Sequence, residues 1–209
     1  MPNLDAAGNE PLQGDVDRVV VTRDEIADRV AELAVRIEEH YRRAEGGDEG
    51  PEITVLAVLT GALVFLSDLI RRLSLAVKVK VVSASSYPGP RTSPDGLELR
   101  MLPEASLAGR NVLVVDDILD TGRTLATIVQ AVQRQRPGSV KTCVLLAKDR
   151  HDLPERIRAD FVGFHVAPEF VVGYGLDFDD LYRNLPDICT LKGGVLARRG
   201  GRHVEEGRP

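Results

Sequence analysis

The sequence predicts an α/β fold built on a mainly parallel sheet. Short apolar runs rich in β-branched residues recur along the chain, and segments with helical periodicity separate most of them. Strands of a parallel sheet are buried on both faces, so they read as continuous apolar runs, and alternation with helices is typical of that architecture. The 209 residues, 43% of them hydrophobic, suffice for one globular unit with a core.

A helix is expected near the N-terminus, after residues 1–17, which are polar, lack periodicity and indicate a mobile tail. Thr22 and Glu25 form a capping-box pattern, in which each side chain can bond the backbone N–H of the other residue. Apolar residues then recur at helical spacing as far as about Arg43. They are Ile26, Val30, Leu33 and Ile37.

Further apolar runs indicate buried strands, and two segments between them have the periodicity of helices. The strands are expected at residues 53–59, 75–84, 111–115, 140–147 and 161–166. The helices are expected at residues 62–73 and from residue 125 onward.

Three segments lie outside this pattern of strands and helices. Residues 85–96 are mostly turn formers and predict a long loop, of the kind that often serves as a lid or binding loop. Residues 170–177 are mainly apolar and are expected to close the core. From Gly193 onward, five glycines in seventeen residues predict a disordered C-terminal tail, residues 193–209. The folded domain is therefore expected to span residues 18–192.

The most informative stretch is residues 111–124, where an apolar strand leads into acidic and hydroxyl-bearing residues. We expect the strand to end at Val115, which leaves Asp116 and Asp117 at the carboxyl edge of the sheet, where open α/β folds bind ligands. Five loop residues then precede the helix. They are Asp120, Thr121, Gly122, Arg123 and Thr124.

This loop has the chemistry of a phosphate site. Backbone N–H groups at a helix start bind phosphate, and a glycine lets the chain approach the ligand closely. The neighbouring carboxylates would repel a phosphate unless they bind ribose hydroxyls or Mg²⁺. A Walker B strand is the competing interpretation, but the chain has no G-x-x-x-x-G-K-[ST] segment to supply its partner loop.

Composition restricts the partners and the compartment. A net charge of −5 and a pI near 5.5 argue against a nucleic-acid or anionic membrane surface, so a small-molecule partner is expected. Two cysteines, Cys143 and Cys189, do not make a disulfide framework and fit a reducing cytoplasm. The chain shows no signal peptide and no apolar run of 18 residues, so neither export nor membrane spanning is expected.

Residues 112–125, V-L-V-V-D-D-I-L-D-T-G-R-T-L, resemble the phosphoribosyl-pyrophosphate signature of the type I phosphoribosyltransferases, in the form of the hypoxanthine-guanine branch. Three other stretches match that family in order along residues 18–192. They are Leu59–Ala62 (pyrophosphate loop), Ser85–Tyr87 (flexible loop), and Phe170–Asp177 with Tyr182–Pro186 (purine and second-metal segment). The resemblance implies a twisted, mainly parallel sheet with helices on both faces and a small hood.

The resemblance also implies a reaction, in which the 5-phosphoribosyl group passes from phosphoribosyl pyrophosphate to a 6-oxopurine and pyrophosphate is released. Mg²⁺ is the implied cofactor, since negative charge builds on the leaving group. Asp116 and Asp117 would hold the ribose hydroxyls and a first metal ion, and Asp177 a second. The sugar phosphate would lie on residues 120–124, with the hydroxyls of Thr121 and Thr124.

The resemblance further assigns the recognition of the base. Asp120 would accept the purine N7 proton as N9 attacks. Lys148 would donate to an exocyclic oxygen, which excludes adenine. Phe170 would stack on the base, and the backbone of Val171 would meet its Watson–Crick edge.

By the same resemblance, Thr60 and Gly61 would contact pyrophosphate, and the guanidinium of Arg183 would bind it as well. Ser86 and Tyr87 would belong to the flexible loop that closes over the site. Many family members carry Lys or Arg where this chain has Thr60, so a side-chain cation is lost there while backbone contacts stay available. A non-proline cis peptide bond at Thr60 and Gly61 is also implied.

Other interpretations stay open from the sequence. Taken singly, Lys148, Phe170, Asp177 and Arg183 read equally well as a strand-end charge, a core residue, a turn residue and a surface residue. The same fold also supports a xanthine-preferring enzyme or an RNA-binding regulator, although a regulator of that kind should have a basic face. Neither the choice among hypoxanthine, guanine and xanthine nor that between homodimer and homotetramer follows from the sequence.

Overall fold

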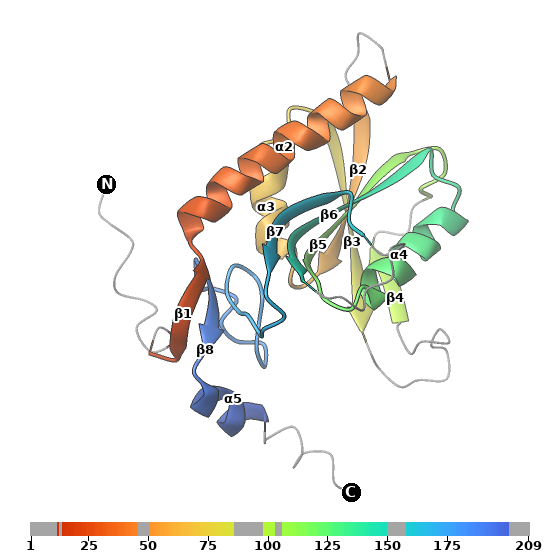
Figure 1. Ribbon diagram of the computed structural model, residues 1–209. Coiled ribbons are helices and arrows are strands. Elements are labelled where there is room, and N and C mark those ends of the chain that lie inside the picture. The colour runs from red at the N-terminus through yellow and green to blue at the C-terminus, as the bar shows by residue number, and fades with distance from the viewer. Residues whose placement is uncertain are drawn as a thin grey trace, which may run out of the picture. The chain divides into compact units, whose positions relative to one another are not determined.

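The computed structural model describes residues 12, 14–45, 51–85, 98–102, 106–149 and 158–200 (Figure 1). The chain forms two compact units. Ala27–Pro168 make up the first, called here the core unit, and Met1–Ile26 with Glu169–Pro209 make up the second, called here the terminal unit. Ser86, Tyr87 and the expected lid at residues 88–95 lie outside the described residues.

The core unit contains a six-stranded sheet in the order β4-β3-β2-β5-β6-β7. Its strands are β2 (Glu52–Leu59), β3 (Ala76–Ser85), β4 (Glu98–Leu102), β5 (Asn111–Leu119), β6 (Ser139–Lys148) and β7 (Phe161–Val166). Five of them run parallel, and only β4 pairs antiparallel, with β3. The prediction of an α/β fold on a mainly parallel sheet is therefore confirmed, with β5 between β2 and β6.

Helices cover both faces of this sheet (Figure 1). The helices are α2 (Arg23–Glu45), α3 (Leu63–Ile70) and α4 (Arg123–Arg134). The connection β2-α3-β3 runs along the sheet in one direction and β5-α4-β6 in the other, so right-handed crossovers place α3 and α4 on opposite faces. Leu125, Ile128 and Val132 of α4 pack on Val112 and Val114 of β5.

The central strand is longer than the sequence indicates. The prediction that it ends at Val115 is wrong, because pairing with β6 continues through Asp116–Val144 and Ile118–Leu146 to Leu119. The apolar run of β6 reaches Lys148 and supplies partners for the extra residues of β5. The acidic pair therefore lies within a hydrogen-bonded strand, whose backbone holds it in place.

The terminal unit has a small sheet of its own, in which β1 (Val16–Val21) and β8 (Ile188–Leu191) run antiparallel. A helix, α5 (Gly193–Gly200), follows β8. The unit's core contains Val172, Tyr182, Leu185, Leu191 and Val195. The expectation of a disordered tail is thus wrong for residues 193–200, because Val195 is only 3% exposed and its N–H donates to the carbonyl of Lys192.

The N-terminal boundary also differs from the expectation. Val16 belongs to β1, and Asp15 accepts a hydrogen bond from the hydroxyl of Tyr182 at 2.8 Å, so the folded unit begins before residue 18. None of the helices in the described part of the chain is long and apolar enough to span a membrane.

One buried hydroxyl in the core unit generates a test of the packing. Thr54 of β2 is 1% exposed and its Oγ1 has no hydrogen-bond partner, so Thr54→Val should raise the free energy of unfolding, by about 1 kcal/mol. The matched control is Thr142→Val, because the Thr142 hydroxyl donates to Asp160 at 2.9 Å and accepts from its N–H at 3.0 Å. That change should lower stability by about 1–3 kcal/mol. Denaturant titration measures both, and a destabilised Thr54→Val would contradict the prediction.

Candidate functional site

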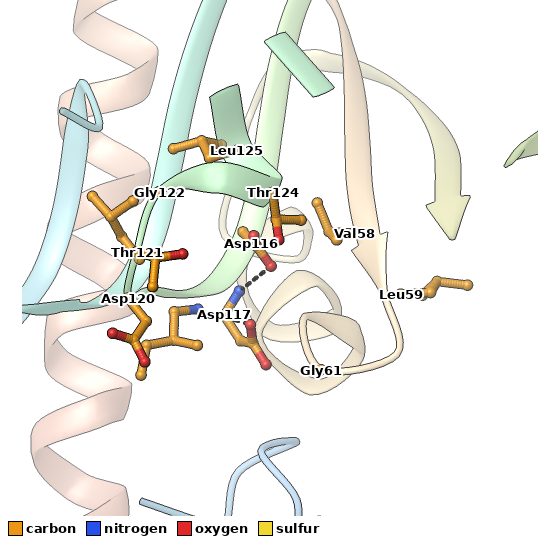
Figure 2. A pocket seen from close by; sticks show the side chains of 12 residues that line it. Val58, Leu59, Gly61, Asp116, Asp117, Asp120, Thr121, Gly122, Thr124 and Leu125 are labelled. Carbon is orange, nitrogen blue, oxygen red and sulfur yellow. Dashed lines mark hydrogen bonds between the residues drawn. The ribbon is translucent and has the colours of Figure 1, made fainter. Parts of the chain in front are cut away.

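A pocket of about 270 Å³ opens in the core unit where β5 ends and α4 begins (Figure 2). The end of β2, the following turn, the end of β5 and the loop before α4 all contribute. The lining residues are Val58, Leu59, Gly61, Asp116, Asp117, Ile118, Leu119, Asp120, Thr121, Gly122, Thr124 and Leu125. Parallel strands of an open sheet end together at one edge, and ligands of α/β folds bind at that edge.

The loop into α4 has the geometry of a phosphate cradle. Gly122 occupies the N-cap position with φ +72°, a left-handed conformation that glycine adopts without a Cβ penalty. No side chain caps this helix end, and the Gly122 carbonyl already accepts from the N–H of Ala126 at 2.9 Å. Uncapped N–H groups of a first helical turn, with the helix dipole behind them, favour an anion. Thr121 and Thr124 add hydroxyls to the same wall of the pocket.

The acidic pair at the end of β5 is electrostatically strained. Asp116 is only 6% exposed, and its Oδ1 accepts the backbone N–H of Asp117 at 3.0 Å (Figure 2). Burial raises the pKa of Asp116 well above its ordinary value, and the negative charge of Asp117 raises it further. Asp117 is partly buried, and its Oδ1 accepts the N–H of Ile118 at 2.7 Å. A bound cation or a set of hydroxyl donors would relieve the repulsion between these carboxylates.

The turn after β2 lies directly against this pair. A Cβ built on Gly61 would overlap Oδ2 of Asp117, so glycine is required for the observed packing. The peptide bond between Leu59 and Thr60 is cis, one bond before Thr60–Gly61. The structure therefore joins two motifs that lie more than fifty residues apart in the sequence.

Asp120 and Lys148 form an ion pair beside the pocket. The Lys148 Nζ donates to Asp120 Oδ2 at 2.7 Å, and the side chains are 12% and 39% exposed. Lys148 is the last residue of β6, and Asp120 follows β5, so adjacent parallel strands deliver the two charges to the same edge. The Lys148 side chain is largely buried while that of Asp120 is partly open to solvent, and the short contact orients the carboxylate toward the ammonium.

A second group of predicted residues gathers on the terminal unit. Arg183 bonds Asp177 at 2.9 Å, Asp180 at 3.1 Å and the Gly175 carbonyl at 2.8 Å. Phe170 is 44% exposed, whereas Val171 is buried. Asp180 was not among the predicted site residues, although two consecutive acidic residues, Asp179 and Asp180, lie close to Arg183 in the sequence.

The structure thus sorts the predicted residues into three sets. Asp116, Asp117, Asp120, Thr121, Gly122, Thr124 and Gly61 line one pocket, with Lys148 joined to it through Asp120. Thr60 and Arg123 are adjacent in sequence to lining residues without being among them. Phe170, Val171, Asp177 and Arg183 belong to the terminal unit.

The two carboxylates of the acidic pair are side chains of this pocket whose chemistry fits a cation. No group of three or more His, Cys, Asp or Glu side chains suited to a metal occurs among the described residues. Mg²⁺ commonly binds through one or two carboxylates and takes its other ligands from water and substrate phosphates. Two carboxylates beside a phosphate cradle fit that mode of binding.

Comparison with known proteins identifies close relatives. The family model described as "Phosphoribosyl transferase domain" matches residues 22–179. The hypoxanthine-guanine-xanthine phosphoribosyltransferase of Tritrichomonas foetus is 36% identical over 185 residues, 88% of this chain and 97% of that protein. The hypoxanthine-guanine phosphoribosyltransferase of Bacillus subtilis is 35% identical over 184 residues, 88% of this chain and 98% of that protein.

Other relatives differ in length or are known in three dimensions. The bifunctional protein TilS/HprT of Listeria monocytogenes is 38% identical over 185 residues, but this chain spans only 27% of its length. The solved structure of a Trypanosoma cruzi hypoxanthine phosphoribosyltransferase is 35% identical, with a TM-score of 0.79 over 90% of this chain and 97% of that one. A Bacillus anthracis hypoxanthine-guanine phosphoribosyltransferase is also 35% identical, with a TM-score of 0.73 over 85% of this chain and 99% of that one.

The buried acidic pair generates a pH-dependent prediction. The folded protein retains the Asp116 proton to a higher pH than the unfolded chain, so stability should fall as pH rises above the ordinary value of 3.8 toward the raised pKa. Asp116→Asn removes the buried charge and therefore this loss of stability with rising pH. Its melting temperature should exceed that of the wild type by a margin that grows from about pH 4 to neutrality, and each 1 kcal/mol corresponds to about 2–4 °C.

Thermal melts in a buffer with chelator measure this margin. Asp28→Asn serves as the control, because Asp28 is an exposed carboxylate of α2. A margin for Asp116→Asn that shrinks or stays flat with rising pH would refute the electrostatic account.

Proposed function

Because the chain belongs to the phosphoribosyl transferase domain family, whose model matches residues 22–179, we propose that it is a purine salvage enzyme. It transfers the 5-phosphoribosyl group from phosphoribosyl pyrophosphate to hypoxanthine or guanine, forming IMP or GMP and releasing pyrophosphate. The observation that carries this proposal is the pocket that combines a phosphate cradle, an acidic pair and the Asp120–Lys148 ion pair.

The pocket suits the sugar half of phosphoribosyl pyrophosphate. The 5′-phosphate lies on the backbone of residues 120–124, where the glycine N-cap and the start of α4 favour an anion. The hydroxyls of Thr121 and Thr124 donate to it. Asp116 and Asp117 accept the ribose 2′- and 3′-hydroxyls, which supply the hydrogen-bond donors that the strained carboxylates need.

Magnesium is the proposed cofactor, held by Asp116 and Asp117 directly or through water. When bound with pyrophosphate, it offsets the negative charge that develops on the leaving group. For Asp177 we propose a second metal contact, and for Arg183 a contact to pyrophosphate through its guanidinium fork. Arg183 neutralises Asp177 in this structure, so the guanidinium exchanges one set of oxygen acceptors for another when it binds pyrophosphate.

The Asp120–Lys148 pair is proposed to carry both proton transfer and base selection. Asp120 accepts the N7 proton as N9 attacks C1 of the ribose. Lys148 has three N–H donors, so its ammonium can bond Asp120 and still donate to the exocyclic oxygen of a 6-oxopurine. Adenine offers an amino group at that position, so the N–H of Lys148 that faces the base has no acceptor there, although the bond to Asp120 remains.

The remaining assignments follow the family resemblance. We propose that Phe170 stacks on the base, that the backbone of Val171 meets its Watson–Crick edge, and that Ser86 and Tyr87 belong to the loop that closes over the substrates. Thr60 and Gly61 contact pyrophosphate through the backbone, since Thr60 carries no charge. We also propose a homodimer or homotetramer, and a cytoplasmic location that suits two buried, free cysteines.

One assay tests the proposal. Nucleotide formation from phosphoribosyl pyrophosphate is measured with hypoxanthine, guanine, xanthine, adenine and uracil, with and without Mg²⁺. Hypoxanthine and guanine should be converted only with Mg²⁺, and adenine should be disfavoured by about 10⁴-fold, because it leaves a buried donor unpaired. Adenine turnover comparable to hypoxanthine would overturn the assignment, and preferential use of xanthine would favour the xanthine-specific alternative.

A second prediction concerns the general base. Asp120→Asn should lower kcat by about 10²- to 10⁴-fold and change the KM for phosphoribosyl pyrophosphate little, since it removes a transition-state interaction. Asp149→Asn is the matched control, because Asp149 follows Lys148 directly but is 63% exposed and faces His165. Steady-state kinetics distinguish the two variants, and an unchanged kcat in Asp120→Asn would remove the base assignment.

A further inference from the structure

Phe170, the ring that the proposed function places on the purine, has little support from its own surroundings. It is 44% exposed, although the preceding Glu169 pairs with Arg18 and the following Val171 is buried. The residues on both sides of Phe170 therefore have contacts that hold them, whereas its own side chain is exposed. Among the described residues its ring meets one other ring, that of Phe178, with centroids 5.3 Å apart and planes at 75°.

That contact has the edge-to-face geometry that aromatic pairs prefer. Such pairs contribute beyond the area they bury, because the positive edge of one ring meets the negative face of the other. An exposed aromatic side chain free to rotate would lose rotamer freedom on binding a base. A neighbouring ring that already restricts its rotamer lowers that cost.

Phe178 is itself held rigidly. It opens a tight turn in which its N–H donates to Leu181 at 3.2 Å and its carbonyl accepts from Leu181 at 3.1 Å. The two central residues, Asp179 and Asp180, have φ of 57° and 56°, the left-handed values of a type I′ turn. The Phe178 side chain packs against the core cluster of the terminal unit, defined above by Val172 and Tyr182 among others.

The turn is also tied to the charged segment. Asp177, directly before Phe178, accepts the N–H of Asp180 at 3.0 Å and the guanidinium of Arg183 at 2.9 Å. Phe178 therefore joins the proposed stacking ring on one side to the proposed pyrophosphate and metal residues on the other. No role for this residue follows from the motif assignments above.

We infer that Phe178 is a positioning residue for purine recognition, which orients the Phe170 ring for stacking and couples it to the Asp177–Arg183 segment. This inference rests on the proposed function. Because Phe178 acts on the base through Phe170, its loss affects binding of the base more than binding of phosphoribosyl pyrophosphate. A residue that served only the core would instead change stability without separating the two substrates.

The experiment compares Phe178→Leu, which keeps apolar volume without a ring, with Phe178→Tyr, which keeps the ring. Leu181→Ala is the control, since it removes apolar atoms from the same turn and Leu181 is 38% exposed. Phe178→Leu should raise the KM for hypoxanthine about 3- to 10-fold and weaken IMP binding in calorimetry by the same factor. The KM for phosphoribosyl pyrophosphate should change less than about 2-fold, and Phe178→Tyr should restore wild-type values.

The results distinguish the positioning role of Phe178 from the proposed function. An unchanged KM for hypoxanthine in Phe178→Leu, an equal rise in both KM values, or a failure of Phe178→Tyr to restore them would overturn the positioning role while leaving the proposed function intact. A Leu181→Ala variant with the same base-specific defect would do so as well. A wild-type protein that converts no purine base would instead refute the proposed function, and this inference with it.

Discussion

A buried carboxylate at the end of the central strand constrains the whole core unit. Asp116 is nearly inaccessible, the neighbouring Asp117 carries a charge of the same sign, and burial raises the pKa of Asp116. A charge in such a place is costly unless something binds it. Its position is nevertheless imposed, because β5 pairs with β6 through Asp116 itself and with β2 as far as the preceding residue, Val115. The stability of the sheet thus offsets the free-energy cost of burying this charge. A ligand that offers hydroxyl donors, or a cation, lowers that cost when it binds.

Oppositely charged partners hold several of the other proposed ligand-binding groups. Asp120 pairs with Lys148, and Asp177 pairs with Arg183. Partly buried pairs of this kind fix side-chain orientation, and their net contribution to stability is modest once desolvation is counted. Their value lies in geometry: the charges already stand in the orientations that binding requires, so less conformational freedom is lost when substrates arrive.

Backbone strain in the terminal unit is concentrated where function is proposed. Tyr174, Asp179, Asp180 and Tyr182 all have positive φ, and so do the two glycines that flank Tyr174, Gly173 and Gly175. A Cβ on Gly173 would overlap the carbonyl of Asp187, so close packing as well as φ requires glycine there. Left-handed conformations of non-glycine residues persist only where surrounding contacts impose them, and they cluster at ligand clamps. Asp177 and Arg183 both bond Asp180, and these contacts hold the turn at Asp179 and Asp180 in this conformation.

Sequence patterns were sufficient to predict most strands and helices of the core unit and to propose its ligand site. The period of the apolar residues predicted the five parallel strands and the helices between them, because burial on one face or two is encoded locally. The loop before α4 could be proposed as a phosphate site from residue types alone, because a glycine and hydroxyls at a helix start suit an anion. The acidic residues beside it pointed to ribose or metal for the same reason.

Only the tertiary structure decided what depends on segments far apart in the chain. β1 and β8 pair across the whole sequence, Tyr182 bonds Asp15 at a separation of 167 residues, and α5 is ordered because Val195 reaches the core of the terminal unit. Local composition indicated tails at both ends, since neither segment has enough apolar residues to fold alone. The Asp120–Lys148 pair, the packing of Gly61 on Asp117 and the ring contact of Phe178 likewise arise when the folded chain brings distant residues together, and no local pattern encodes them.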